Sequence, residues 1–166
     1  FADSRSFLGD EVTAFGFFDG EEHFIGPCKT RSGNYPFCED ILLPAYSLTK
    51  TISGTLGIAA YEKKYGPISN LLVRDIVPSC SDKKWKDITI ENLSDMTTGH
   101  YKSTIYYGDE DSLASANFIF NDLSHEEKVN FSCNYYPRKK KPGAEFVYHT
   151  SDTYLIGTTL NNLLSD

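Results

Sequence analysis

Residues 51–61 constrain the fold of this chain more than any other stretch, because they are small or apolar on every side. A helix without a polar face is usually surrounded by other elements, so the stretch predicts a central, buried helix over residues 47–64. A lysine, Lys50, stands in the first turn of that helix, three residues after Ser47. The simplest interpretation of Lys50 is a side chain that reaches solvent from the helix end.

Ser47 and Lys50 also form an S-x-x-K pattern that can activate a serine. A serine hydroxyl becomes a good nucleophile only when a base lies within hydrogen-bond reach. Residues three apart share one face of a helix, so the amine of Lys50 can reach the oxygen of Ser47. Burial disfavours the ammonium form of a lysine, and a helix N-terminus favours negative charge beside it. The pair therefore predicts a nucleophilic serine, although the tetrapeptide alone also arises by chance.

The composition bounds the class of protein. The chain has 166 residues, of which 40% are hydrophobic, and this is enough for one sizeable core or two small lobes. The net charge of -7 gives no global support to a nucleic-acid partner. The basic run 138–141 precedes a Pro-Gly pair and is interpreted as a solvated turn. No apolar stretch approaches the roughly 20 residues that cross a bilayer, so no membrane span is expected.

Turn residues divide the chain into short strands followed by helices. Asp19-Gly20 lies between two apolar stretches, 11–18 and 22–28, and predicts a β-hairpin. A Gly-Asn-Tyr-Pro loop follows over residues 33–36. Further helices are expected over residues 68–77, over a segment capped by Thr89 and ended at Gly99, over 113–131 and over 151–164, with a loop over 101–112.

This order predicts an α+β protein with two lobes. Residues 1–66 would carry the hairpin and the first helix, and residues 67–166 would form a mainly helical lobe. Two strands alone are marginal as a sheet. Either the first helix covers them, or further strands of the same sheet are missing, and we expect the chain to be the N-terminal part of a longer protein.

The four cysteines are too scattered to define a disulfide scaffold. Cys28 and Cys38 flank a turn-rich segment and could pair in an oxidising compartment, but buried thiols are an equal alternative. The sequence leaves the disulfide state of Cys80 and Cys133 open as well. No C-x-x-C occurs, so a structural zinc site is not expected.

Three segments together resemble the serine β-lactamase and penicillin-binding-protein superfamily, in its branch of class C-like β-lactamases and esterases. Residues 46–51 (Y-S-L-T-K-T) resemble the nucleophile segment of that family. Residues 88–99 (I-T-I-E-N-L-S-D-M-T-T-G) are similar to its I-T-I-x-x-L-L-x-x-T-S-G segment. Residues 142–157 resemble its P-G-x-x-F-x-Y-S-N segment and the helix that follows. The order and spacing of the three segments also agree.

The resemblance implies a fold and a set of roles. The fold would be β-lactamase/transpeptidase-like, with strands of an antiparallel sheet packed by the nucleophile helix and the C-terminal strands missing. Ser47 would be the acyl-accepting nucleophile, Lys50 its proton partner and Tyr148 the family tyrosine that helps move the proton. Thr150 and Tyr46 would contact substrate. No metal or organic cofactor is implied, and a periplasmic or secreted location is favoured.

Two departures from the family qualify this expectation. The family has an asparagine where Thr150 stands, and a hydroxyl has a shorter reach than an amide. Thr150 therefore argues against lactam recognition. Residues 148–153 and 95–99 resemble the esterase and 6-aminohexanoate-oligomer hydrolase relatives more closely, and this resemblance implies a small-molecule ester or amide as substrate. The family's later strand with K-T-G or H-x-G, which supplies half of the oxyanion hole, is also missing here.

The sequence leaves several alternatives open. The chain could be a penicillin-binding or sensor-type relative that is acylated without turnover, or an inactive fragment. Ser47, His149 and Asp152 form a Ser-His-Asp set on paper, but the G-x-S-x-G elbow that often accompanies such a set is absent. Several tyrosines could line an aromatic cleft near Ser47 or lie exposed in loops, namely Tyr46, Tyr101, Tyr106 and Tyr107.

Overall fold

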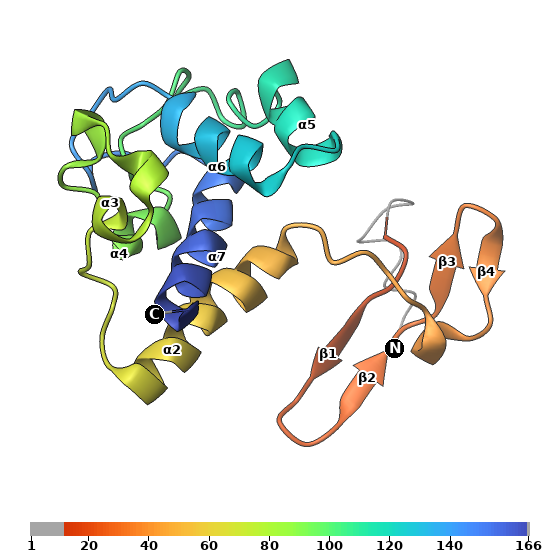
Figure 1. Cartoon of the computed structure of the whole chain (residues 1–166). Helices are drawn as coiled ribbons and strands as arrows, with labels where there is room; N and C mark the ends of the chain where they lie inside the picture. Colours follow the sequence, from red (N-terminus) through yellow and green to blue (C-terminus); the bar gives the residue numbers. More distant parts are fainter. Residues whose placement is uncertain (1–11, 166) are drawn as a thin grey trace. The chain divides into compact units, whose positions relative to one another are not determined.

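The computed structural model describes residues 12–165, and the chain divides into two compact units, Phe1–Ala45 and Tyr46–Asp166 (Figure 1). The expected division lay after residue 66. The structure instead groups the helix that follows Ser47 with the helical region, because Gly54 of that helix lies against Thr153 and Ile156. A Cβ at this position would lie 3.6 and 3.7 Å from these two side chains, which is ordinary van der Waals contact, so the two helices lie close together here.

The described part of the first unit, residues 12–45, contains two hairpins. Strand β1 (Gly16–Phe18) pairs antiparallel with β2 (His23–Ile25), which confirms the predicted hairpin. Strand β3 (Cys28–Thr30) pairs with β4 (Gly33–Tyr35), where only a loop was expected. Gly33 adopts a φ of 104°, which lets the chain reverse within two residues and so allows the second hairpin. A short 3-10 helix, η1 (Cys38–Asp40), follows.

A disulfide between Cys28 and Cys38 closes the second hairpin onto η1, with the two Cα atoms 5.4 Å apart. This agrees with one of the two alternatives that the sequence left open for these cysteines. A small sheet buries little apolar surface, so a covalent link stabilises a unit of this size.

The second unit begins with the predicted helix. It consists of a π-helical stretch, η2 (Lys50–Leu56), that continues into α2 (Gly57–Tyr65). The expectation of a fully buried helix was wrong. The helix packs one face on α7 (Thr150–Ser165) and buries Gly54 and Ile58, whereas three apolar side chains of another face are more than half exposed, namely Leu48, Ile52 and Leu56.

The remaining helices are short. They are α3 (Val73–Ile76), η3 (Pro78–Cys80), η4 (Lys83–Trp85), α4 (Ile90–Ser94), α5 (Leu113–Phe120) and α6 (His125–Asn134). Four of them, η4, α4, α5 and α6, begin at a residue whose side chain caps the helix. Thr89 caps α4 as predicted, but α4 ends at Ser94 rather than at Gly99. The single helix expected over residues 113–131 is two, because Ser124 forms a capping box that starts a new helix.

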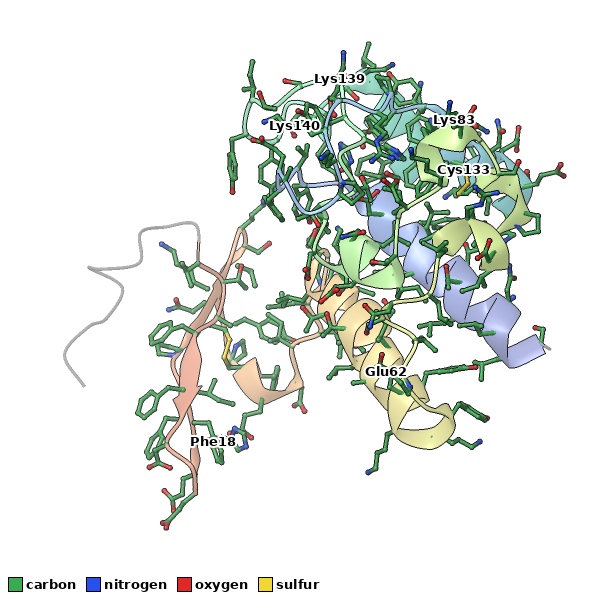
Figure 2. All side chains as sticks on the ribbon, turned by 90° about the vertical axis from the view of Figure 1, so that its left-hand side faces the viewer. Phe18, Glu62, Lys83, Cys133, Lys139 and Lys140 are labelled. Atoms are coloured by element: carbon green, nitrogen blue, oxygen red, sulfur yellow. A yellow bond between two sulfur atoms is a disulfide. The ribbon has the colours of Figure 1, made fainter. Side chains whose placement is uncertain are left out.

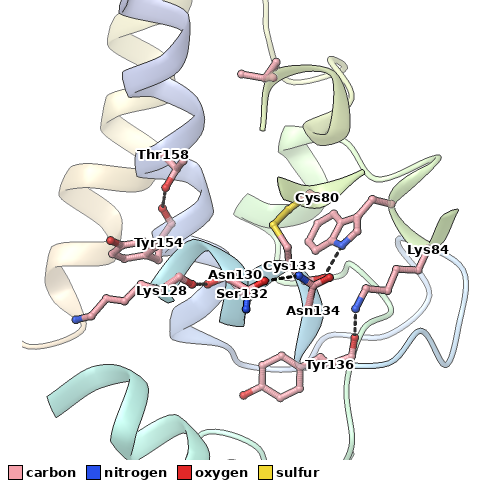
Figure 3. The surroundings of a disulfide bond; sticks show 12 residues. Cys80, Lys84, Lys128, Asn130, Ser132, Cys133, Asn134, Tyr136, Tyr154 and Thr158 are labelled. Carbon is pink, nitrogen blue, oxygen red and sulfur yellow. Dashed lines mark hydrogen bonds between the residues drawn. A yellow bond between two sulfur atoms is a disulfide. The ribbon is translucent and has the colours of Figure 1, made fainter. Parts of the chain in front are cut away.

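The core of the second unit lies between α2, α3, α4, α6 and α7. Its fully buried side chains include Val73, Trp85, Ile88, Ile90, Leu93 and Leu155. The indole nitrogen of Trp85 donates to the carbonyl of Cys133 at 2.8 Å. A disulfide between Cys80 and Cys133 lies beside this bond, and the sequence had not predicted it (Figure 3). These links join the segment around residue 80 to the end of α6.

Candidate functional site

Ser47, Lys50 and Tyr148 meet at the start of the central helix. Lys50 Nζ donates a hydrogen bond of 2.8 Å to Ser47 Oγ, and the Tyr148 hydroxyl donates one of 2.7 Å to the same oxygen. The serine is exposed, and the other two side chains are half-buried. Both donors are groups that can lose a proton, and either one would then accept the serine proton instead of donating to its oxygen.

The backbone presents Ser47 at a sharp turn. Tyr46, directly before it, has a φ of 43°, in the left-handed region that side chains other than glycine rarely adopt. Conformations of this kind cluster at functional sites, where the surrounding structure has to hold them in place. The turn leaves the hydroxyl of Ser47 in solvent at the N-terminal end of the helix, where partial positive charge favours a developing negative charge.

Aromatic contacts hold Tyr148 in position. The ring of Tyr107 stacks on it with centroids 4.9 Å apart, and Tyr106 packs edge-on against Tyr107. Lys50 Nζ lies 5.0 Å from the centre of the Tyr148 ring. Tyr107 and Tyr106 therefore lie near Ser47, which agrees with the first of the two positions that the sequence left open for these tyrosines. Tyr101 is buried elsewhere, with its backbone bonded to Pro137.

A pocket of about 460 Å³ begins at Lys50. Its lining combines hydroxyl-bearing and aromatic side chains, namely Tyr46, Thr49, Ser53, His125, Thr150, Thr153, Tyr154 and Thr158, with Gly157 and Asn161. His125 Nδ1 and the Tyr154 hydroxyl are joined by a hydrogen bond of 2.8 Å across it. Both predicted substrate contacts, Tyr46 and Thr150, line this pocket, whereas Ser47 and Tyr148 lie outside its lining.

Thr150 is hydrogen-bonded to Glu110, a residue that the sequence analysis did not single out. Glu110 accepts a hydrogen bond of 3.0 Å from the Thr150 backbone N–H and a further, short one from the Thr150 hydroxyl. Since Thr150 is the first residue of α7, the Glu110 carboxylate satisfies a free N–H at that helix terminus and complements its dipole. An acidic pair in the loop at 109–110 was the signal that could have pointed to this role.

His149 is directed away from Ser47. Its Nε2 lies 3.0 Å from Asp109 Oδ2, and its ring stacks on Tyr136 with centroids 4.1 Å apart. Burial lowers the pKa of His149, against the opposing effect of Asp109. The Ser-His-Asp set considered from the sequence is therefore not assembled, because the buried partner of His149 is Asp109.

Asp152 is fully buried in the first turn of α7. Burial raises its pKa well above the usual value, and the nearby Glu110 carboxylate adds to the shift. One of its oxygens, Oδ2, has no hydrogen-bond partner among the described residues. A neutral carboxylic acid is the form that such a site favours.

The described residues contain no group of three His, Cys, Asp or Glu side chains that could hold a metal ion. Within residues 12–165, no helix is long and apolar enough to span a membrane. No protein-family model matches this chain, and no curated protein shows significant similarity to it.

Proposed function

We propose that this chain is a serine hydrolase that forms an acyl-serine intermediate on an ester or amide. The observation that carries the proposal is the pair of hydrogen bonds at Ser47 Oγ, 2.8 Å from Lys50 Nζ and 2.7 Å from the Tyr148 hydroxyl. A serine in contact with two groups that can exchange protons is the arrangement that nucleophilic catalysis requires.

The reaction would proceed in two halves. Lys50 or Tyr148, in its deprotonated form, takes the Ser47 proton while Oγ bonds to the substrate carbonyl carbon and the carbonyl electrons move to oxygen. When the carbonyl re-forms, the bond to the leaving group breaks and the leaving group takes up that proton. A water molecule then attacks the acyl-serine in the same way and releases the acid.

Two observations support a β-lactamase-related enzyme of the esterase type. The tyrosine of the third resembling segment, Tyr148, contacts the serine of the first, Ser47. The hydroxyl of Thr150, which replaces the family's asparagine, is held by Glu110. A hydroxyl already bonded to a carboxylate is a poor ligand for a lactam carbonyl, so we favour ester or amide hydrolysis over lactam recognition.

The proposal is tested by active-site labelling. The purified chain is treated with a fluorophosphonate and, separately, with a labelled penicillin, and adducts are mapped by peptide mass spectrometry. Ser47→Ala is compared with Ser53→Ala, since Ser53 lies on the same helix, lines the pocket and donates only to the Thr49 carbonyl at 2.6 Å. We expect a phosphonate adduct on Ser47 that the first variant loses and the second keeps.

The same experiment separates the alternatives. Phosphonate labelling with steady release of p-nitrophenol from p-nitrophenyl esters supports a hydrolase. A penicillin adduct that persists without turnover indicates a sensor-type relative instead. A folded chain that is not labelled at Ser47, or that is labelled equally after Ser47→Ala, contradicts the proposal.

A further inference from the structure

The cations of the chain are unevenly distributed. The protein carries a net charge of -7, yet two short segments contain seven of its 16 Lys and Arg residues, namely Lys83, Lys84, Lys86, Arg138, Lys139, Lys140 and Lys141. The sequence analysis treated the second segment alone and interpreted it as a solvated turn. Figure 2 shows Lys83, Lys139 and Lys140 at the same end of the second unit.

Specific bonds join the two basic segments. Arg138 donates to the Lys84 carbonyl at 2.9 Å, and Lys84 Nζ donates to the Tyr136 carbonyl at 2.8 Å. The Cys80–Cys133 disulfide lies a few residues before each segment and links η3 to α6 (Figure 3). The cations are therefore held together by the tertiary structure.

Between the segments lies a groove of about 800 Å³, larger than the pocket beside Lys50. Its lining consists of Lys83, Lys84, Lys86, Asp87, Thr89, Glu91, Asn92, Arg138, Lys141 and Pro142. Five cations thus face two carboxylates, and Arg138 already forms a two-pronged ion pair with Asp87.

Three of the groove lysines are available for an anion. Lys83, Lys86 and Lys141 are exposed, and none of them makes a side-chain hydrogen bond or ion pair with another residue in the range 12–165. Like charges held close together repel one another, and an anionic ligand would relieve that repulsion. The ammonium group of lysine acts as a compact point charge that suits phosphate or sulfate oxygens.

We propose that this groove binds a linear sulfated glycan. Clusters of Lys and Arg are typical of both nucleic-acid and heparin-binding surfaces. The cysteines favour the second class, because all four form disulfides, and disulfides persist in oxidising compartments outside the cytosol. Sulfated polysaccharides are the linear polyanions of such surroundings. The site is separate from Ser47 and does not depend on the proposed hydrolase activity.

The test is binding to heparin with a charge-matched control. The full chain, the groove variant K83Q/K86Q/K141Q and the control variant K63Q/K64Q/K102Q are compared by heparin-affinity chromatography and by titration with a heparin oligosaccharide. All six lysines are exposed and belong to the second unit, so each variant loses the same charge and is expected to fold. Circular dichroism checks the fold of each.

We expect the groove variant to elute at lower salt and to bind the oligosaccharide about tenfold more weakly, since exposed charge pairs each contribute only modestly to an interaction. The control variant should behave like the unaltered chain. Equal losses in both variants, or none in either, would overturn the proposed site. Equal competition by desulfated heparin, or by an RNA of similar length, would overturn the assignment to a sulfated glycan.

Discussion

Tyr148 and Ser47 are 101 residues apart in the sequence and are joined by a hydrogen bond of 2.7 Å. The bond connects the residue two positions before the start of α7 to the turn residue just before the central helix. Those two helices pack on each other through Gly54, Gly57, Ile156 and Leu160, so the geometry of the contact depends on the core of the second unit. Ser47 and Tyr148 thus lie just before the N-termini of two helices that pack on each other.

Removal of the Tyr148 hydroxyl should impair the activated serine without unfolding the chain. We expect Tyr148→Phe to lower the rate of Ser47 phosphonylation or of ester turnover by about 10²-fold, the lower range for a positioned proton donor or acceptor. Tyr107→Phe is the matched control, because Tyr107 stacks on the same ring but makes no bond to Ser47. Equal rates in the two variants would show that Tyr148 has no part in the chemistry.

Glu110 should stabilise the N-terminus of α7. It accepts from both the backbone N–H and the hydroxyl of Thr150, and charge-assisted bonds at a helix start are worth about 1–2 kcal/mol. Glu110→Gln should lower the free energy of unfolding by that amount in urea. Glu126→Gln is the control, since this exposed residue lies in the first turn of α6 outside the capping box, and its substitution should cost less than about 0.5 kcal/mol.

The Cys80–Cys133 disulfide should contribute more stability than the Cys28–Cys38 disulfide. It spans 53 residues against 10, and loop-closure entropy predicts about 4 kcal/mol for the longer loop against about 3 kcal/mol for the shorter. Replacing Cys80 and Cys133 by Ala should lower the midpoint of the Trp85 fluorescence transition, Trp85 being the only tryptophan. The first unit is tested separately by replacing Cys28 and Cys38. An unchanged midpoint without the longer link would contradict this prediction.

Mild acid should destabilise the second unit through His100. Burial lowers the pKa of His100 from 6.5 to about 4. As the pH falls from 6.5 to 4, the unfolded chain takes up a proton that the folded chain does not, so the free energy of unfolding decreases, by up to about 3 kcal/mol. The lowered pKa of His149 acts in the same direction, whereas the raised pKa of Asp152 favours the fold at low pH.

The measurement is the free energy of unfolding at several pH values for the unaltered chain and for His100→Gln. The variant should show a flatter dependence between pH 6.5 and 4. His23→Gln, at an exposed position of β2, should keep the original slope. If both variants retain that slope, His100 is not the source of the acid sensitivity.

Local patterns in the sequence predicted those helices and turns whose formation depends mainly on neighbouring residues. The apolar stretch after Ser47, the turn at Asp19-Gly20 and the cap at Thr89 each led to an element that the structure contains. Boundaries were less predictable. Residues 113–131 read as one helix from their composition, but the side chain of Ser124 accepts a hydrogen bond from the Glu127 N–H at the start of a second helix.

The sequence by itself determined the nucleophile candidate, because Ser47 and Lys50 lie one helical turn apart and must share a face wherever the helix packs. Only the tertiary structure decided which residues far apart in the sequence come into contact. Tyr148 bonds to Ser47, Glu110 bonds to Thr150, and Cys133 pairs with Cys80. The two basic segments likewise come together around one groove. Such contacts depend on how helices bury their apolar faces in a common core, and no local spacing in the chain encodes that choice.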